Sequence, residues 1–223
     1  MERLLCIGLG YVFGCLQFAY ILGKVLKGID IRQYGSGNAG TTNAIRVLGT
    51  KIGIATLVLD ILKAVAALVI IALIWGYDQK HRLLWGGIGV VLGHNYPFYM
   101  QFRGGKGVAA TIGIFLAADI RLLLIAGIPA LVLLAITKYM SVASLTYMLL
   151  LVITTAFFYL GQPHGVEVLI LAAVLALSGF WRHRGNIKRL LHGQEVKMGQ
   201  KVSVDAKEKS ETSGNDVVGQ HTK

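Results

Sequence analysis

Long apolar stretches alternate with short polar ones along most of this chain. Five of them, residues 4–22, 52–75, 122–136, 142–160 and 166–181, are nearly free of charged residues. A helix that crosses a bilayer needs ~20 apolar residues, with ~17 tolerated. Only helices and closed barrels satisfy their backbone in hydrocarbon, and these stretches lack the two-residue alternation of a barrel strand. The pattern therefore predicts an all-α, polytopic membrane helix bundle.

Two shorter apolar stretches lie between the second and third of these runs. One begins near Leu83 and should end before Pro97, because the residue before a proline disfavours helix. The other, residues 108–118, is too short to cross a bilayer unless neighbouring loop residues also enter the membrane. We expect about seven transmembrane helices, or five full spans if these two segments are re-entrant. The polar stretch 202–223 predicts a disordered cytoplasmic tail after a single membrane domain, 1–201.

The distribution of charge indicates a membrane topology rather than a nucleic-acid partner. The chain is 55% hydrophobic and 15% charged, where a soluble domain has about a quarter charged residues, and its net charge is +11. A basic surface can bind a phosphate backbone. With the N-terminus outside, however, fourteen Lys and Arg residues fall near the inner span ends and only four, Arg3, Lys80, Arg82 and Arg121, near the outer ones. This positive-inside asymmetry predicts a cytoplasmic C-terminus and no nucleic-acid partner.

The cysteines and the first apolar stretch exclude two further classes of protein. Cys6 and Cys15 lie nine residues apart on one predicted helix, where they face different directions and cannot pair. The chain has no zinc-ligand spacing and no grouped carboxylates on the inner loops, so we expect neither a metal nor a cofactor. The first stretch lacks a basic leader and a small-residue cleavage site, and Lys24 follows it, so we expect a retained span rather than a signal peptide.

Three polar segments on the predicted inner side carry the unusual residues. The first, residues 35–46, combines glycines with Ser, Thr and Asn and ends at Arg46. Glycine lets backbone N–H groups approach a ligand, and Arg46 adds a planar guanidinium, so the segment suits a phosphate. The alternative is a flexible loop between spans. The Gly-x-Gly-x-x-Gly spacing of residues 35–40 does not indicate a dinucleotide fold, because no strand precedes it.

The second segment contains His94, Pro97 and the run Gly104-Gly105-Lys106-Gly107. This run again offers open backbone together with a point charge. It is not a Walker A loop, because Met100 stands in place of the first glycine and Gly107 in place of the final Ser or Thr. Nucleotide hydrolysis is therefore not supported. His94 could exchange a proton or donate to a phosphate, although a single histidine near a helix end is more often structural.

The third segment, residues 182–195, is basic, which the positive-inside rule already explains. His183 and Asn186 need a further reason, because at i and i+3 they share one helical face. Ser141 and Ser144 repeat that spacing at the inner start of a later span.

Asp60 and Lys63 lie within the apolar stretch 52–75, also three residues apart. A charge at the centre of a bilayer costs at least ~2.5 kcal/mol, so the two side chains should pair and face the inside of the bundle. We favour a structural ion pair over a direct role with substrate.

Together the three segments resemble the membrane glycerol-3-phosphate acyltransferases that use acyl phosphate as donor. The likeness covers about residues 4–198, in the same order and on the same side, and is more specific than any one motif. It rests on Ser36-Gly37-Asn38 through Asn43 and Arg46; on Gly93-His94 through Pro97 with Gly104-Gly105-Lys106-Gly107; and on Arg182-His183 with Asn186-Ile187, Arg189-Leu190, Gly193 and Glu195. Thr41 stands where the family usually has Ala, a small change that leaves the interpretation intact.

The resemblance implies a seven-helix enzyme of bacterial phospholipid synthesis in the cytoplasmic (inner) membrane, with an active site open to the cytoplasm. It would transfer a fatty acyl group from acyl phosphate to glycerol 3-phosphate, giving 1-acylglycerol 3-phosphate (lysophosphatidic acid) and inorganic phosphate. The implied catalytic residues are Ser36, Arg46, His94, Lys106, His183 and Asn186. The expected substrate- and phosphate-binding residues are Gly37, Asn38, Thr41, Asn43, Gly104, Gly105, Gly107, Ser141 and Ser144. An enzyme that produces acyl phosphate would be a partner for handover of the donor.

The residues also fit this chemistry independently of the resemblance. Two phosphate substrates need several cations and backbone amides, and we expect the three segments to converge into one anion-binding pocket that supplies them. Acyl phosphate is already activated, so no covalent enzyme intermediate is required, and positioning with electrostatic stabilisation carries most of the rate. The proton of the attacking hydroxyl has three candidate acceptors, His94, His183 and a phosphate oxygen of the donor, and the residues leave this choice open.

Two other functions would account for part of this pattern. A transporter or channel for phosphorylated solutes also suits broken helices and basic loops. A transporter alternates access between two faces, however, and here every polar segment falls on one side. A purely structural membrane protein would leave the phosphate-suited segments unexplained. No histidine is followed five positions later by Asp, so the His-x-x-x-x-Asp pair of another acyltransferase class is absent. This absence also weakens the case for an acyl-CoA or acyl-carrier-protein donor.

Overall fold

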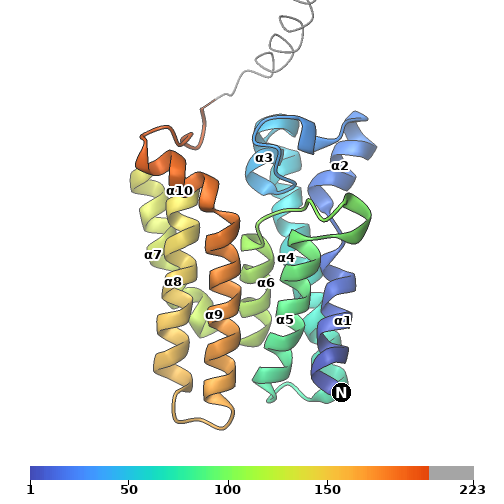
Figure 1. The fold of residues 1–223 in the computed structure, drawn as a ribbon, viewed down its shortest axis with the longest axis vertical. Helices are drawn as coiled ribbons and strands as arrows, with labels where there is room; N and C mark the ends of the chain where they lie inside the picture. The colour runs from blue at the N-terminus through green and yellow to red at the C-terminus, as the bar shows by residue number, and fades with distance from the viewer. Residues whose placement is uncertain (201–223) are drawn as a thin grey trace, which may run out of the picture.

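The computed structural model describes residues 1–200, so the predicted tail 202–223 lies outside the described residues. Within them the chain forms helices and connecting loops but no strand, which confirms the predicted all-α class (Figure 1). The α-helices are α1 (Glu2–Gly14), α2 (Phe18–Lys27), α3 (Thr41–Leu48), α4 (Thr50–Trp75), α5 (Lys80–Asn95), α6 (Val108–Ala118), α7 (Ile120–Thr137), α8 (Met140–Tyr159), α9 (Gly165–Arg182) and α10 (Arg184–Leu191). Two short 3-10 helices, η1 (Ile31–Gln33) and η2 (Phe98–Met100), lie in the loops.

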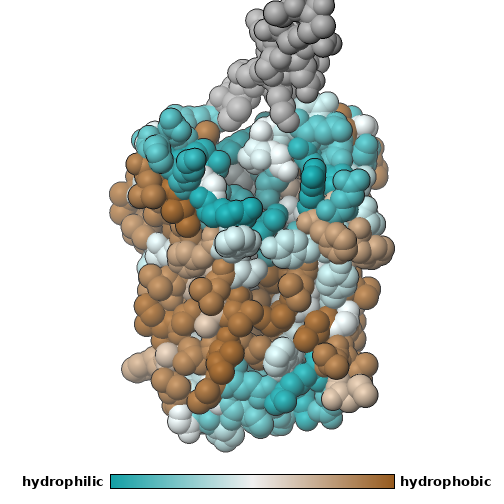
Figure 2. Space-filling view, viewed as in Figure 1, coloured by the Kyte–Doolittle hydropathy of each residue, from teal (hydrophilic) through white to brown (hydrophobic). Residues whose placement is uncertain are grey.

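Five segments of residues 1–200 are long and apolar enough to cross a membrane, namely α1 with α2, α4, α7, α8 and α9. They correspond to the five apolar stretches of the sequence. On the face that Figure 2 draws, hydrophobic surface covers the middle of the molecule between two more hydrophilic ends. Helices α5 and α6, with 16 and 11 residues, are the two shorter segments. They would complete a bundle of seven membrane helices, and that count stays a prediction.

The first apolar stretch is not the continuous helix that its sequence predicted, because it is interrupted between α1 and α2. An interruption at membrane depth frees backbone groups that must find partners inside the protein. The carbonyl oxygen of Leu16 accepts a hydrogen bond from Nζ of Lys63 on α4 at 2.5 Å. The buried side chain of Gln17 donates to the carbonyl oxygen of His94 at 2.9 Å. The interruption therefore joins the first span to α4 and to the end of α5.

Helices α1 and α5 pack with their backbones in contact. A Cβ atom placed on Gly10 would lie 2.0 Å from the carbonyl oxygen of Gly86, and one on Gly93 would lie 2.3 Å from that of Tyr11. Small residues permit such close approach between membrane helices, where packing rather than the hydrophobic effect drives association. This contact fixes the C-terminal end of α5, which carries His94.

The inner loop 23–51 contains more regular structure than the sequence predicted. Helix α2 extends into it, and helix α3 places Asn43 and Arg46 on a helix rather than in a flexible loop. Ala44 and Leu48 form the buried side of α3, which packs against α4. The glycines that precede α3 indicated a loop, so the short amphipathic helix that follows them was not predicted.

All three polar segments lie at one end of the bundle. Figure 1 shows α3, the loop after α5, and α10 at the end where the described chain finishes, opposite the N-terminus. The turns between α4 and α5 and between α8 and α9 lie at the other end. The segments therefore share one side, as the sequence predicted, while the membrane face that each end meets stays a prediction.

Candidate active site

The first polar segment is held in shape by Asn43 on α3. Its side-chain oxygen accepts a hydrogen bond from the backbone N–H of Ser36 at 2.9 Å. Its amide donates to the carbonyl oxygens of Ile31 and Tyr34 at 3.2 and 3.0 Å. Asn43 is buried, whereas Ser36 is exposed. These contacts make Asn43 the residue that shapes the loop, and they leave Ser36 free to meet a ligand.

The second segment closes against the end of α5. The backbone N–H of Gly105 donates to the carbonyl oxygen of His94 at 2.9 Å. A Cβ atom on Gly105 would lie 2.0 Å from Nε2 of His94 and 2.9 Å from the carbonyl oxygen of Ala39 in the first segment. Only glycine fits at this position, so Gly105 brings the two segments together. The buried imidazole of His94 lies at their junction.

Arg182, the last residue of α9, ties the third segment to the second. Its guanidinium donates to the carbonyl oxygen of Gly105 at 2.7 and 3.0 Å and to that of Gly104 at 3.0 Å. The next residue, His183, forms the junction between α9 and α10. The single helical face that the spacing of His183 and Asn186 suggested is therefore replaced by a turn between two helices.

Lys106 lies where the second and third segments meet. Its ammonium donates a hydrogen bond to Oδ1 of Asn186 on α10. The amide of Asn186 donates to Oε1 of Glu195 at 2.6 Å, and the hydroxyl of Ser141 on α8 donates to the same oxygen at 2.9 Å. Arg189 pairs with the other carboxylate oxygen at 2.8 Å. Side chains from distant parts of the chain thus form one hydrogen-bonded network around the Lys106 cation.

Arg46 reaches this network from α3. Its guanidinium donates to the carbonyl oxygen of Val196 at 3.3 Å, next to Glu195. Burial lowers the pKa of Arg46, and Glu195 opposes that effect. An arginine nevertheless remains charged in a protein, so Arg46 brings a permanent cation from the first segment. The three segments converge, as the sequence predicted.

The Lys106 ammonium is surrounded by other cations. Burial, followed by the charges of Arg189, Arg182 and Arg46, lowers the pKa of Lys106 to about 8, although Glu195 opposes them. Glu195 stays ionised, because hydrogen bonds outweigh its burial and lower its pKa. A bound anion would favour the charged form of Lys106. The electrostatics of the site therefore suit a ligand of high negative charge.

The family model for glycerol-3-phosphate acyltransferase matches residues 4–193 of the chain. The chain belongs to the glycerol-3-phosphate acyltransferase family. The enzyme of Thermoanaerobacter pseudethanolicus is 40% identical over 196 residues, which cover 88% of this chain and 96% of the relative. That of Halalkalibacterium halodurans is 41% identical over 198 residues, which cover 89% and 96%. The crystal structure of PlsY (YgiH), an integral membrane glycerol 3-phosphate acyltransferase, in its glycerol 3-phosphate form is similar with a TM-score of 0.80 and 36% identity, over 89% of this chain and 96% of that one.

These similarities confirm the resemblance that the three motifs indicated. The protein is an acyltransferase and an integral membrane protein. The match spans nearly the whole described chain, so it includes the first two polar segments and the third as far as Gly193, rather than one motif. Neither a transporter nor a purely structural protein is needed to explain them.

In this acyltransferase one ring nitrogen of His183 is free to accept a hydrogen bond. Its Nδ1 lies 2.8 Å from the carbonyl oxygen of Gly179, which can only accept a hydrogen bond, so Nδ1 carries the proton. Burial, and then the charge of Lys106, lowers the pKa of His183 to about 4. The imidazole is therefore neutral near pH 7, and the lone pair of Nε2 is available to a substrate hydroxyl.

The remaining predicted site residues make fewer contacts with the other site residues than Lys106 and Asn186 do. The hydroxyl of Ser144 donates to a carbonyl oxygen of its own helix at 2.8 Å. Oγ1 of Thr41 is buried and has no hydrogen-bond partner within residues 1–200. Gly107 adopts a left-handed conformation (φ 84°) where α6 begins. Gly37 and Asn38 lie in the loop before α3, and Gly37 is also left-handed (φ 71°).

Arg182 and Glu195 were not among the predicted site residues, although both lie in the third motif. Arg182 was explained by the positive-inside rule, and Glu195 stood alone as a carboxylate among basic residues. That isolation was the available signal, because a single acid amid many cations will be drawn into ion pairs. The structure shows that Arg182 shapes the glycine loop and that Glu195 holds Asn186.

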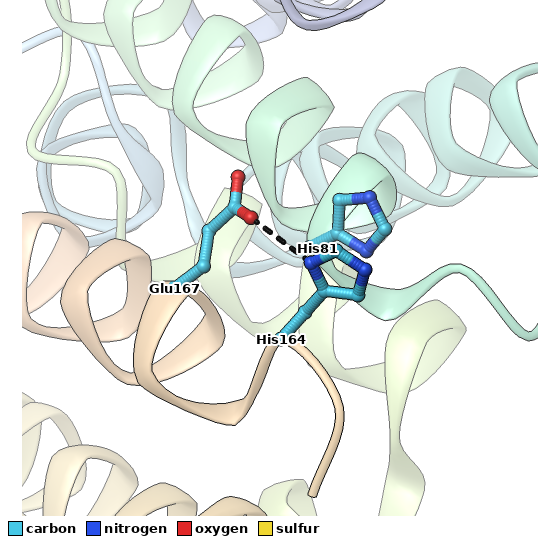
Figure 3. A group of neighbouring side chains, drawn as sticks. All are labelled: His81, His164 and Glu167. Carbon is cyan, nitrogen blue, oxygen red and sulfur yellow. Dashed lines mark ion pairs between the residues drawn. The ribbon is translucent and has the colours of Figure 1, made fainter.

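A second polar cluster, formed by His81, His164 and Glu167, lies where α5 and α9 begin (Figure 3). His81 at the start of α5 stacks on His164 with ring centroids 4.1 Å apart, and Glu167 of α9 lies beside them. Their possible ligand atoms lie within 4.8 Å of one another, whereas ligands of tetrahedral zinc lie ~3.4 Å apart for bonds of ~2.1 Å. Arg3 also pairs with both oxygens of Glu167 at 2.8 and 3.0 Å. The cluster is not a preformed metal site, and we assign it to joining α1, α5 and α9.

Proposed function

We propose that the enzyme transfers a fatty acyl group from acyl phosphate to glycerol 3-phosphate, releasing 1-acylglycerol 3-phosphate and inorganic phosphate. The observation that carries this proposal is the convergence of Arg46 and Lys106 around Glu195 at one end of the bundle. Both substrates carry a phosphate, and an unpaired phosphate near the membrane boundary would be costly. One carboxylate balances only part of the positive charge there, so the site retains charge for the two substrates.

The relatives support the acceptor and the product. The crystal structures of PlsY (YgiH) include a glycerol 3-phosphate form and a lysophosphatidic acid form. We infer that this chain binds both ligands, because its match covers 96% of that protein. The names of the relatives do not specify the donor. We infer acyl phosphate as the donor from the cationic site and from the absence of a His-x-x-x-x-Asp pair in the sequence.

We assign the phosphates to two kinds of cation. Arg46 offers a planar fork that matches phosphate oxygens, and Lys106 offers a compact ammonium whose position Asn186 holds. Ser36 adds a hydroxyl from the exposed loop. Arg182 binds the carbonyl oxygens of the glycine loop, so we give it a shaping role rather than a direct contact.

The reaction forms a bond between a glycerol oxygen and the acyl carbon and breaks the bond between that carbon and the phosphate oxygen. Phosphate leaves with the electron pair of the broken bond. Nε2 of His183 can accept a hydrogen bond from the attacking hydroxyl, whereas Nδ1 of His94 is already occupied by Lys63. Since the pKa of His183 is about 4, its imidazole is too weak a base to keep the proton near pH 7. We therefore assign final uptake of the proton to the departing phosphate.

The proposal includes a membrane topology. The polar segments lie at the end opposite the N-terminus (Figure 1), and the excess of Lys and Arg there favours the cytoplasm. We therefore place the N-terminus outside the bacterial cytoplasmic membrane and the active site on its inner face, with α5 and α6 completing seven spans. An enzyme that makes acyl phosphate would deliver the donor from the same side.

Donor preference tests the proposed reaction. Purified protein in lipid nanodiscs would receive labelled glycerol 3-phosphate together with palmitoyl phosphate, palmitoyl-CoA or a palmitoyl carrier protein. We expect lysophosphatidic acid only from palmitoyl phosphate, with equimolar release of inorganic phosphate. Product from either thioester, with none from palmitoyl phosphate, would contradict the proposal.

A further inference from the structure

A charged cluster lies inside the bundle directly behind His94. Lys63 and Asp60 on α4 form the ion pair that the sequence predicted, with Nζ 2.7 Å from Oδ1 and side chains that are 1% and 2% exposed. The same ammonium lies 2.5 Å from the carbonyl oxygen of Leu16, at the interruption of the first span, and 2.9 Å from Nδ1 of His94. Three elements of the fold therefore meet at one buried cation.

The surroundings of Lys63 determine which nitrogen of His94 carries the proton. A lysine ammonium has three N–H donors and no acceptor. Two of its neighbours, the carboxylate of Asp60 and the carbonyl of Leu16, can only accept. Because the ammonium can only donate, its contact with His94 requires Nδ1 of the imidazole to present its lone pair, so the proton resides on Nε2.

The other edge of the imidazole faces the candidate active site. The position of a Cβ atom on Gly105 would be 2.0 Å from Nε2 of His94 and 2.9 Å from the carbonyl oxygen of Ala39. Nε2 thus lies where the first two phosphate-suited segments meet. A neutral imidazole with its proton on Nε2 offers a hydrogen-bond donor to an anion there, whereas the other tautomer would present a lone pair.

Stability alone does not explain why charges occupy this position. A charge at membrane depth is costly, and apolar residues of similar volume often replace a buried ion pair without loss of stability. We propose that Lys63, with Asp60 as its counter-ion, is a positioning residue for acyl transfer that holds His94 as the Nε2–H tautomer. The kinetic part of this inference rests on the proposed function, whereas the tautomer does not.

Nuclear magnetic resonance of the full chain tests the tautomer without any substrate. The protein would carry ¹⁵N-labelled histidine in nanodiscs, and His94→Gln would assign the His94 signals among the six histidines. We expect a neutral ring with Nε2 protonated and Nδ1 unprotonated, and loss of this single form in Asp60→Leu/Lys63→Met. A wild-type ring protonated on Nδ1, or a tautomer that the double variant leaves unchanged, would overturn the proposal.

Kinetics test whether the tautomer matters for turnover. The double variant removes both charges at similar volume, and Thr56→Val, one turn earlier on α4 and also buried, is the matched control. We expect kcat of monodisperse Asp60→Leu/Lys63→Met to fall at least tenfold with KM for glycerol 3-phosphate within threefold, while Thr56→Val keeps wild-type kinetics. A purely structural pair would lower stability but leave kcat of the folded protein unchanged, and that result would refute the positioning role.

A third background shows whether Lys63 acts through His94. If the ion pair acts only by orienting the imidazole, removing the pair should have no further effect on kcat/KM in a variant that lacks the imidazole. Adding Asp60→Leu/Lys63→Met to His94→Gln should therefore lower kcat/KM by less than twofold further. A full additional tenfold loss would show that Lys63 acts elsewhere. Failure of palmitoyl phosphate as donor would remove the proposed function but leave the magnetic resonance result standing.

Discussion

Lys106 and Asn186 are joined by a hydrogen bond although eighty residues separate them along the chain. Lys106 follows the glycines of the second polar segment, and Asn186 lies on α10 after the last span. Asn186 is held in turn by Glu195, so two successive hydrogen bonds fix the direction of the Lys106 ammonium. A cation whose position is fixed before substrate binds loses little entropy on binding, which favours positioning as a source of rate.

The pH dependence of kcat/KM should report the titration of Lys106. Burial and neighbouring cations lower its pKa from 10.5 to about 8, so the ammonium is charged below that pH and neutral above it. If its charge is needed to bind phosphate, kcat/KM for glycerol 3-phosphate should fall about tenfold per pH unit above pH 8, since this parameter follows the free enzyme. Initial rates between pH 6 and 10 would measure it.

The matched control for this titration is a change of cation. Lys106→Arg carries a charge that persists above pH 12, so the alkaline fall should disappear even where the rate is lower. Lys188→Arg, at an exposed lysine of α10, should leave the profile as in the wild type. An alkaline limb that survives unchanged in Lys106→Arg would show that another group titrates.

Arg46→Ala should nearly abolish acyl transfer while the protein still folds. Its only hydrogen bond in the described chain is a long one to Val196, so little of the fold depends on it. Loss of one preorganised hydrogen-bond donor to a developing negative charge typically costs about 100- to 1000-fold in rate. We expect kcat/KM to fall in that range, and Arg103→Ala, at an exposed arginine of the glycine loop, to change it less than threefold. Equal activity in the two variants would remove Arg46 from the phosphate site.

Gly105→Ala should impair activity because its methyl group would collide with Nε2 of His94 at 2.0 Å. Overpacking of this kind costs about 1–3 kcal/mol in stability. We expect kcat/KM at least tenfold lower and a lower thermal unfolding temperature in detergent. Gly8→Ala on α1 is the control, because a Cβ atom there meets no neighbour within 4 Å. A Gly105→Ala enzyme with normal kinetics would mean that the contact between the glycine loop and His94 is not required.

Asn186→Ala should be more damaging than Ser141→Ala, although both side chains donate to Glu195. Loss of Asn186 removes the hydrogen-bond partner of Lys106, whereas Glu195 keeps its ion pair with Arg189 in either variant. Hydrogen bonds to charged groups contribute about 1.5–3 kcal/mol. We expect kcat/KM to fall about 10- to 100-fold in Asn186→Ala and less than threefold in Ser141→Ala. The reverse order would indicate that the path from Glu195 to Lys106 does not pass through Asn186.

The helices could be predicted from the sequence because membrane spans depend on length and hydrophobicity. The predicted stretches 52–75 and 108–118 agree with α4 and α6, which span Thr50–Trp75 and Val108–Ala118. The interruption of the first span could not be predicted in the same way. No proline or charge marks it, and its freed carbonyl at Leu16 is satisfied by Lys63 of another helix. Local sequence does not contain that partner.

The sequence predicted the residues of the site better than it predicted the contacts between them. Arg46, Lys106 and Asn186 were expected to converge, and the structure brings them around Glu195. The role of Asn43 was not predictable, because its three partners are backbone groups that only the folded loop presents. Residue type and spacing identify groups that suit a phosphate, but they do not show which of those groups the fold uses to support itself.

A structure of this enzyme with glycerol 3-phosphate and a non-hydrolysable acyl phosphonate bound would test the central claim most directly. The claim is that three distant segments form one anion-binding site. We predict both phosphorus groups at the α3–α10 end of the bundle, each with an oxygen within about 2.7–3.2 Å of a nitrogen of Arg46 or Lys106. Either group bound away from both cations, or at the end that carries His81 and Glu167, would contradict the account.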